Sequence, residues 1–321
     1  MFRETGVLSS FFRFCRLCPR SCGIDRFKNR GFCGEKANLK VSAILTHFGE
    51  EPPISGKNGS GTVFFTGCSL KCRYCQNFQI SHMGLGKIMT PDEVVKEIEI
   101  LYLNESIHNI NLVTPDHFIP YTFEIINIMR EKNILLPIIF NFSGYQKVKV
   151  IKWLSGYADI YLPDFKYSDK ELGKFLSNCP DYSKVAIEAI YEMIKQKGFL
   201  DSFNNYKNGE KNEGEILTQK GVLVRHLILP GFIENSLNVL NILFVEFGKE
   251  LPISLMSQFY PIACDKTPEL NRRITEEEFK EVFDYAKSLG FQNLFIQYPE
   301  KSMNKPAFLP DFSKKEPFVL N

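Results

Sequence analysis

The sequence predicts an α/β fold: a partial (βα)6 barrel preceded by an N-terminal cysteine-rich metal-binding module. Three observations support this prediction. Strand-like and helix-like segments alternate along most of the chain, as they do in βα units around a parallel sheet. The chain has 321 residues, of which 44% are hydrophobic, so it can form one large domain or two average ones with a real core. The first 60 residues do not follow the alternation, and they contain four of the nine cysteines.

The predicted strands are short and rich in β-branched and aromatic residues. They are expected at residues 62–67, 109–113, 137–142, 159–162, 221–229, 253–259 and 293–297. The first of them ends at Gly67, directly before a group of cysteines. We therefore divide the chain into the cysteine-rich module (1–61), the barrel (62–298) and a C-terminal tail (299–321).

Helices are predicted between these strands, and two of them have clear start signals. The first starts at Thr90, which is followed by a proline and two acidic residues, and the second starts at Thr275 with a capping box. Further helices are expected at residues 121–132, 147–154 and 236–247. The segment 197–220 is rich in Asn, Lys, Glu and Gly and predicts a solvated insertion.

Charge and hydropathy exclude several classes of protein. Lys and Arg number 39 and Asp and Glu 37, so the net charge of +2 gives no strong attraction to nucleic acid or anionic lipid. The longest apolar stretch, 134–140, is far shorter than the roughly 20 residues of a membrane helix. Charged residues at Arg3, Glu4 and Arg13 interrupt the region where a signal peptide would be apolar. We expect a cytoplasmic protein with no membrane contact and no nucleic-acid partner.

The cysteines fall into two tight groups and two isolated residues. An odd number of cysteines in a chain without an export signal argues against a disulfide framework and favours metal ligands. Cys179 and Cys264 stand alone and are interpreted as unpaired thiols.

The second group, Cys68, Cys72 and Cys75, has the spacing C-x3-C-x2-C and follows the first barrel strand. Three thiolates on one short loop can hold three corners of a cubane iron–sulfur cluster, leaving the fourth iron without a protein ligand. A substrate or cofactor can bind at such an open position. One alternative is a zinc site with a fourth ligand such as His82; a redox dithiol formed by Cys72 and Cys75 is less favoured.

This cysteine pattern, with the aromatic Tyr74 before its last cysteine, resembles that of the radical S-adenosylmethionine (SAM) superfamily. The resemblance implies a [4Fe–4S] cluster on Cys68, Cys72 and Cys75, with the amino and carboxylate groups of SAM bound to its open iron. It also implies that the reduced cluster cleaves SAM to methionine and a 5′-deoxyadenosyl radical, and that a flavodoxin or ferredoxin-type protein supplies the electron.

Longer segments are similar to the PflX-like branch, which is named after the pyruvate formate-lyase activating enzyme. They are residues 49–77, 110–118, 140–145, 160–167, 224–231 and 256–261. The resemblance covers nearly the whole chain and implies the fold and the cofactor, but it does not identify a substrate.

Other candidate site residues come from motifs of the superfamily. Residues 114–117 take the place of the Gly-Gly-Glu that usually receives the methionine amino group. Asp164 and Lys166 resemble the Asp-x-Lys element of glycyl-radical activating enzymes, and 227–234 resembles the strand-five motif near the adenine. The candidate cofactor-binding residues are Tyr74, Asn77, Thr114, Asp164, Lys166, His226 and Glu234.

Each candidate also has a purely structural interpretation. Lys166 could be a solvated side chain and Asp164 a turn former, although strand ends in a βα repeat favour function. His226 is equally well interpreted as a core histidine, and Glu234 as the cap of the following helix.

The first group, Cys15, Cys18, Cys22 and Cys33, supplies four thiolates, which satisfy either a tetrahedral zinc or an iron–sulfur cluster. Such a site could be a structural staple whose metal supplies folding energy, or an auxiliary cluster that passes electrons or anchors substrate. The surrounding segment is locally basic, which suits either an acidic partner or a solvated face. The staple is the favoured interpretation.

Three functional hypotheses remain open at this point. The radical could act on a partner protein, making a glycyl radical in it, or on a small molecule or another macromolecule. The chain could instead be a non-catalytic zinc-binding regulatory protein, but a three-cysteine set with an open position argues against this. No residue is assigned as catalytic.

Overall fold

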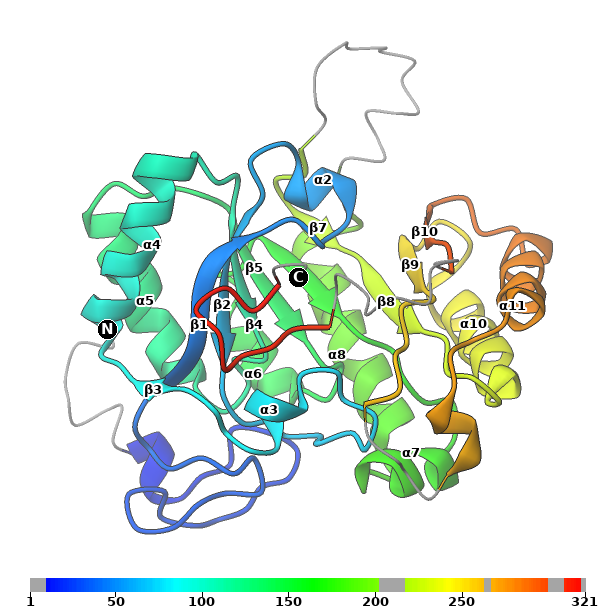
Figure 1. Cartoon of the computed structure of the whole chain (residues 1–321), viewed down its shortest axis with the longest axis horizontal. Coiled ribbons are helices and arrows are strands. Elements are labelled where there is room, and N and C mark those ends of the chain that lie inside the picture. Colours follow the sequence, from blue (N-terminus) through cyan, green and yellow to red (C-terminus); the bar gives the residue numbers. More distant parts are fainter. Residues whose placement is uncertain (1–9, 202–216, 263–266, 300–308, 319–321) are drawn as a thin grey trace.

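The computed structural model describes residues 10–201, 217–262, 267–299 and 309–318 and shows an α/β fold with a mostly parallel sheet (Figure 1). One sheet has the strand order β3-β1-β2-β4-β5-β6-β7 and a second has the order β10-β9-β8. The strands are β1 (Lys40–His47), β2 (Ser60–Phe65), β3 (Lys87–Ile88), β4 (Ile110–Val113), β5 (Ile138–Phe142), β6 (Ile160–Pro163), β7 (Gly221–Val222), β8 (Val224–Leu227), β9 (Ile253–Met256) and β10 (Leu294–Gln297). The α/β fold class predicted from the sequence is thus confirmed.

Neighbouring strands from β2 to β7 and from β8 to β10 pair in parallel. Parallel pairing requires a crossover after each strand, and helices fill these crossovers. The described residues give six strand–helix units followed by β10, an arrangement consistent with a partial barrel. Because the strands run in the same direction, their carboxyl ends meet at one rim of the sheet.

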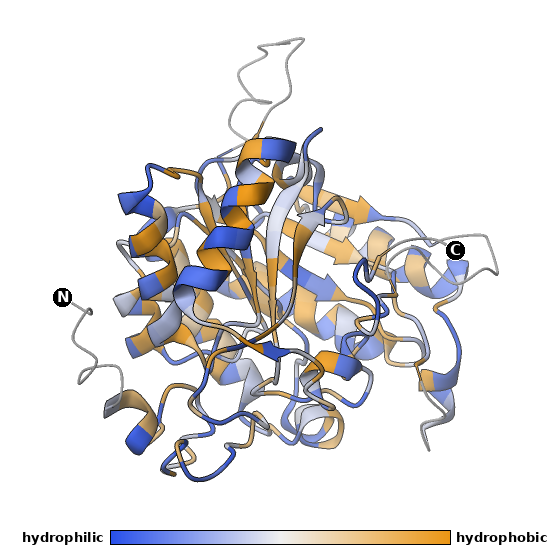
Figure 2. Cartoon of the chain, turned by 60° about the vertical axis from the view of Figure 1, so that its left-hand side comes forward, coloured by the Kyte–Doolittle hydropathy of each residue, from blue (hydrophilic) through white to orange (hydrophobic). Residues whose placement is uncertain are grey.

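The helices cover the outer face of the sheet. The principal ones are α4 (Pro91–Glu105), α5 (Ile119–Glu131), α6 (Val148–Trp153), α7 (Lys170–Ser177), α8 (Tyr182–Lys197), α10 (Ile233–Phe247) and α11 (Glu276–Ser288). Figure 2 shows both hydrophobic and hydrophilic residues on these helices, as expected for elements with one buried face. Thr90 and Thr275 cap α4 and α11 with complete capping boxes, as the sequence predicts.

Short elements complete the frame. They are α2 (Pro52–Ser55), α3 (Phe78–Ser81) and the 3-10 helix η1 (Pro268–Asn271). In Figure 1, α2 and α3 lie at opposite ends of the sheet. In the described part of the chain, no helix is both long and apolar enough to cross a membrane.

The predicted strand at 221–229 is divided into β7 and β8. β7 continues the first sheet beside β6, whereas β8 pairs with β9 in the second. A bridge between Asp164 and Arg225 and a hydrogen bond from Phe165 N to Arg225 O (2.7 Å) join the two sheets at this break. The predicted insertion at 197–220 lies largely outside the described residues.

The first strand of the sheet, β1, lies before the predicted domain boundary at residue 61. β1 pairs antiparallel with β2 along most of its length, from Val41 opposite Phe65 to His47 opposite Ser60. The sequence prediction missed it because a strand that returns antiparallel at the sheet edge does not follow the βα rhythm. Residues 1–61 are therefore not shown to form a separate module.

Residues 14–39 form turns and loops that are fastened to the barrel by Arg26, which is fully buried. Its guanidinium donates to the carbonyl oxygens of His117 (2.5 Å), Lys36 (2.6 Å) and Glu35 (3.3 Å). The same group lies 4.9 Å from the ring of Phe12. One buried cation therefore satisfies carbonyl groups of both the N-terminal segment and the loop after β4.

We expect Arg26→Met to lower the free energy of unfolding by about 3 kcal/mol, because it leaves these buried carbonyl groups without a donor. Arg13→Met is the control: Arg13 is exposed and lies over the ring of Phe27, so its loss should change the same quantity by less than about 0.5 kcal/mol. Urea unfolding of both variants under anaerobic conditions measures the difference. Equal effects would contradict an anchoring role for Arg26.

Candidate functional site

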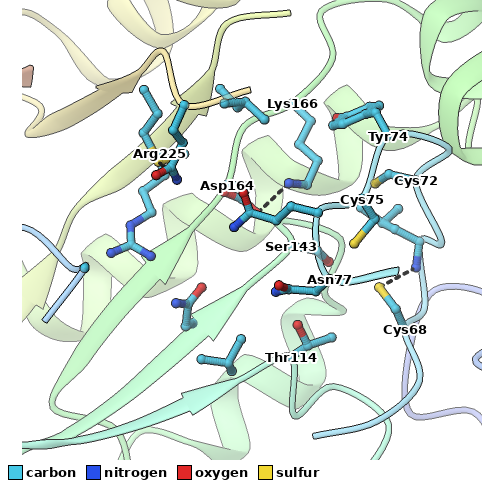
Figure 3. Close-up of a pocket in the computed structure, with 18 of the residues that line it drawn as sticks. Cys68, Cys72, Tyr74, Cys75, Asn77, Thr114, Ser143, Asp164, Lys166 and Arg225 are labelled. Carbon is cyan, nitrogen blue, oxygen red and sulfur yellow. Dashed lines mark hydrogen bonds and ion pairs between the residues drawn. The ribbon is translucent and has the colours of Figure 1, made fainter. Parts of the chain in front are cut away.

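A cavity of about 200 Å³ opens at the rim formed by the carboxyl ends of the strands (Figure 3). Thr114 follows β4, Ser143 follows β5 and Asp164 follows β6, and all three line this cavity. The loop that follows β2 carries the three cysteines and forms another wall. The topology thus brings together residues that are distant in the sequence.

Cys68, Cys72 and Cys75 all line the cavity. The backbone N–H of Leu70 donates to the sulfur of Cys68 (3.4 Å), and the hydroxyl of Ser81 donates to that of Cys75 (3.3 Å). Burial and the neighbouring thiol of Cys72 raise the pKa of Cys75 to about 11, and burial raises the pKa of Cys68 as well. These thiols therefore keep their protons until a metal displaces them.

The chemistry of this donor set fits an iron–sulfur cluster better than zinc. In the described ranges, no group of three or more His, Cys, Asp or Glu side chains is arranged to hold one metal ion. Three thiols that share a cavity supply three of the four corners of a cubane, in which each iron takes its own thiolate. The alternative zinc site with His82 finds no support, since the His82 ring bonds to the Ser81 hydroxyl (2.9 Å).

Asp164 and Lys166 form an ion pair of 2.6 Å inside the cavity. Burial opposes the charge on Lys166, but the neighbouring Asp164 carboxylate outweighs this effect and raises the pKa of Lys166 above its usual value. The pair therefore presents one negative and one positive group beside the cysteines (Figure 3).

Tyr182 fixes the strand ends that carry this pair. Its hydroxyl donates to the carbonyl oxygen of Ser143 (2.8 Å) or of Asp164 (2.9 Å), and it accepts from Lys166 N (3.0 Å). Gly144 has a φ of 80°, and a Cβ there would lie 2.0 Å from the carbonyl oxygen of Asp164. Only glycine permits this close approach of the two loops.

Tyr74, Asn77 and Thr114 also line the cavity, so five of the seven predicted cofactor-binding residues share it. Thr114 adopts a φ of 57°, in the left-handed region that few non-glycine residues visit. Asp116 is not among the lining residues: it is buried and accepts a hydrogen bond from Gln146, and burial raises its pKa to about 6. Of residues 114–117, it is Thr114 that faces the cavity.

His226 and Glu234 lie outside the cavity. Nδ1 of His226 lies 2.7 Å from the carbonyl oxygen of Phe165, which can only accept, so Nδ1 carries the proton and Nε2 accepts from Ser236 (2.9 Å). Glu234 is exposed in the first turn of α10, where it contacts Asn238. This geometry supports the structural interpretation of both residues.

Arg225, to which the sequence assigned no role, lines the cavity on the side away from the cysteines (Figure 3). Arg225 donates to Glu51 through Nε (2.9 Å) and contacts Glu50 and Glu51 through Nη2. Asn111 donates to Glu50 (2.7 Å). The sequence did contain a signal for this cluster: Arg225 lies in a largely apolar strand, and a buried arginine needs buried acidic or polar partners.

Residues 309–318 supply a further wall of the cavity. The ring of Phe318 lies 4.4 Å from that of His47 and 5.5 Å from that of Phe64, and Phe318 lines the cavity. Phe312 packs on Phe64 (5.3 Å), and its backbone N–H donates to Gln79 (2.7 Å). The predicted C-terminal tail is thus, in its described part, a component of the site.

The segment that carries the four N-terminal cysteines contacts the three-cysteine loop at Cys33. Cys15, Cys18 and Cys33 are buried and Cys22 is half-buried. The carbonyl oxygen of Cys33 accepts a hydrogen bond from the backbone N–H of Cys68 (3.1 Å). Burial raises the pKa of Cys18 to about 12, and Asp116, Cys33 and Cys15 add to the effect. Cys179 is buried elsewhere, and Cys264 lies outside the described residues.

We expect stability to depend on pH through His226. Burial lowers the pKa of His226 to about 4, so the unfolded chain, with an ordinary pKa near 6.5, takes up the proton first as pH falls. Relative to a His226→Asn variant, the chain should lose about 2 kcal/mol of unfolding free energy between pH 7 and pH 5. Urea unfolding of both proteins at the two pH values measures this. If the difference in unfolding free energy between the two proteins is the same at both pH values, His226 is not a buried neutral imidazole.

Comparisons with known proteins agree with the site. The model of the Radical SAM superfamily matches residues 62–213. An uncharacterized protein of Methanocaldococcus jannaschii, MJ0674, is 26% identical over 300 residues, which span 90% of this chain and 79% of that protein. A second uncharacterized protein of that organism, MJ0808, is 27% identical over 270 residues, spanning 77% and 70% of the two chains.

Among solved structures, SuiB of Streptococcus suis bound to S-adenosylmethionine matches with 11% identity and a TM-score of 0.45. The match covers 72% of this chain and 48% of SuiB, so it spans about half the length of SuiB. A domain of a pyruvate-formate lyase-activating enzyme from Bacteroides vulgatus matches with 11% identity and a TM-score of 0.37, covering 56% of this chain and 93% of that one. The residues matched by the Radical SAM superfamily model, 62–213, include the cysteine loop and the Asp164–Lys166 pair.

Proposed function

We propose that this chain is a radical SAM enzyme that cleaves SAM reductively and uses the resulting radical to abstract hydrogen from a substrate. One observation carries the proposal: three thiols and an Asp–Lys ion pair line one cavity at the carboxyl rim of the sheet. The three cysteines would hold a [4Fe–4S] cluster, and the cavity would take SAM. The cluster, when bound and reduced, supplies the electron that breaks the carbon–sulfur bond of SAM and yields the 5′-deoxyadenosyl radical.

The protein's own part in this reaction is to bind and orient SAM. Asp164 and Lys166 carry one charge of each sign, and these complement the ammonium and carboxylate groups of the methionine moiety. Tyr182 and Gly144 hold the strand ends that carry the pair. A fixed geometry of this kind positions SAM against the cysteine loop.

The cavity wall would also limit the access of water to the reacting groups once SAM is bound, as a radical reaction requires. Aromatic side chains line much of it: Phe64, Tyr74, Phe142, Phe259, Tyr260 and Phe318. Tyr74 is held between the rings of Tyr167 and Phe259, at 6.5 and 6.2 Å.

The finer predictions from the sequence remain predictions. They are the PflX-like branch, a glycyl radical enzyme as substrate, a flavodoxin or ferredoxin-type reductant, and zinc or an auxiliary cluster on Cys15, Cys18, Cys22 and Cys33. The close approach of Cys33 to Cys68 is compatible with both roles proposed for the N-terminal site.

Cys72→Ser tests the cluster assignment. Because one of three cluster ligands is lost, we expect no SAM cleavage by dithionite-reduced protein and a loss of about four irons and four sulfides per chain. Cys179→Ser is the matched control, since Cys179 is buried outside the cavity and bonds only weakly to Gly173 O (3.5 Å). Cleavage at the parent rate by the Cys72 variant, after anaerobic reconstitution of both, would refute the proposed function.

Lys166→Met tests the SAM site. We expect binding of SAM to the reconstituted protein to weaken more than tenfold, because the cation that complements the methionine carboxylate is lost, while the iron content stays unchanged. Lys170→Met is the control, since Lys170 is an exposed residue of α7 paired only loosely with Glu171 (3.8 Å). Equilibrium dialysis with labelled SAM measures both. Equal affinities would exclude Lys166 from the SAM site.

A further inference from the structure

The end of the cavity away from the cysteines carries more negative than positive charge. Two carboxylates, those of Glu50 and Glu51, share the guanidinium of Arg225, and these side chains are 7%, 8% and 9% exposed. Nε of Arg225 donates to Glu51 (2.9 Å), and Nη2 contacts both carboxylates. One guanidinium balances only one of the two buried carboxylates. We name Glu50, Glu51 and Arg225 the acidic end of the cavity; of these residues, Glu50 and Arg225 line it.

The neighbouring charged groups do not supply the missing positive charge. Among the described residues that line the cavity, Lys166 is the other cation, and it is paired with Asp164 (2.6 Å). His47 lies close enough to Glu50 to interact with its charge, but burial lowers the pKa of His47, so its ring is neutral at pH 7. SAM does not supply the charge either, because in the proposed function its sulfonium lies against the cysteine loop. A buried carboxylate without a cation of its own is destabilising, so the acidic end favours a cationic ligand.

A hydrogen-bond acceptor beside the acidic end is also left without a donor. Asn111 is fully buried on β4, and its Nδ2 donates to Glu50 (2.7 Å). Its Oδ1, on the same amide group, is buried and has no hydrogen-bond partner in the described part of the chain. An unpaired buried acceptor is unusual and indicates a donor that is still to come. A group that brings N–H donors together with a positive charge matches both observations.

The wall beside the acidic end is apolar. Leu227 lies two residues after Arg225 on β8, so both side chains are on one face of the strand, and Leu227 pairs with Met256 of β9. Leu227, Met256 and Phe318 all line the cavity. The ring of Phe318 lies 4.4 Å from that of His47, which places an aromatic surface at the same end, and such surfaces attract cations. A ligand with a cationic head and an apolar stem fits this wall.

The acidic end is next to the place proposed for SAM. In Figure 3 the Asp164–Lys166 pair lies between Arg225 and the three cysteines. A bridge between Asp164 and Arg225 joins the two strand ends directly. SAM bound at the Asp164–Lys166 pair would leave the acidic end free, and a second molecule held there would lie beside SAM.

We propose that the acidic end binds the ammonium group of a small primary alkylamine, which is the substrate, and that Glu50 selects for its positive charge. This inference rests on the proposed function and adds the chemical class of the substrate to it. The stem of the amine would lie along Leu227 and Met256. Hydrogen abstraction then breaks one C–H bond of the stem and forms one in 5′-deoxyadenosine, and the unpaired electron remains on the stem carbon.

Three probes with the same stem and different head groups test the proposal: n-pentylammonium, 1-pentanol and pentanoate. Their binding to reconstituted, SAM-loaded protein is measured by anaerobic isothermal titration calorimetry. We expect the parent to bind pentylammonium at least tenfold more tightly than the other two, because only its head group complements the excess carboxylate. Glu50→Gln keeps the shape of the side chain and removes the excess charge, so it should bind pentylammonium and 1-pentanol equally.

A fourth probe separates a free amine from a lysine side chain. Nα-acetyl-lysine methylamide carries the same ammonium group on a peptide backbone. A cavity of about 200 Å³ that also takes SAM leaves little room for that backbone, so we expect this probe to bind at least tenfold more weakly than pentylammonium. Tighter binding of the lysine derivative would overturn the assignment of a small amine.

Glu99→Gln is the matched control. It removes one carboxylate from an ion pair with Lys132 (2.6 Å) that is outside the cavity, and it should bind all probes as the parent does. The proposal is overturned if the parent does not distinguish pentylammonium from 1-pentanol, or if Glu50→Gln still does. Tighter binding of pentanoate would also overturn it, because Arg225 would then be the anchor of an anion.

The ranking of the probes in the parent needs no variant, so it decides the question even if Glu50→Gln does not fold. The proposed function fails separately from this inference. Absence of dithionite-driven SAM cleavage in the parent would refute the proposed function, whereas the affinities of the probes report on the acidic end alone.

Discussion

The close approach of the N-terminal segment to the chain at Gly67 determines how that segment packs against the cysteine loop. Gly67 ends the segment that leads from β2 into the cysteine loop, and its φ is 76°. A Cβ there would lie 2.7 Å from Cys33 O and 2.6 Å from the side chain of Glu35. Only because this position is a glycine can the N-terminal segment lie against the loop and accept the hydrogen bond from Cys68 N. Two cysteine groups far apart in the sequence thereby become neighbours.

The interior of the barrel places unlike electrostatic environments at the two ends of one cavity. At the cysteine end, burial raises the pKa of the Cys68 and Cys75 thiols. At the other end, Arg225 is buried with Glu50 and Glu51, and although burial opposes ionisation, the guanidinium holds the pKa of Glu51 below its usual value. A buried arginine needs such partners, since an unpaired charge there would be strongly destabilising. The charge of Arg225 in the barrel is thus satisfied internally, whereas Arg13 and Arg16 of the N-terminal segment are exposed.

The sequence predicted the parts of the structure that depend on local pattern. The parallel strands were predicted from short runs of β-branched residues. The starts of α4 and α11 were predicted from their capping boxes. The cysteine loop lies within the range that matches the Radical SAM superfamily model. β1 was missed because its pairing partner is chosen by tertiary structure and its pattern is not distinctive.

The same limit applies to the site. Asp164 and Lys166 could be predicted because strand ends in a βα repeat converge on one rim. The sequence alone could not show whether His226 binds the cofactor or is a core histidine. Its partners, Phe165 O and Ser236, come from other parts of the fold. Phe318 gave no signal, because its role arises only when the chain returns across β2.

That return of residues 309–318 has a practical consequence for anyone preparing the protein. A wall of the cavity is made by a segment that contacts β2 through aromatic rings and α3 through the hydrogen bonds of Gln79. A shortened chain that lacks this segment would leave Phe64 without the rings of Phe312 and Phe318 and would open that wall. The choice of a truncation for crystallisation is therefore a choice about the shape of the cavity.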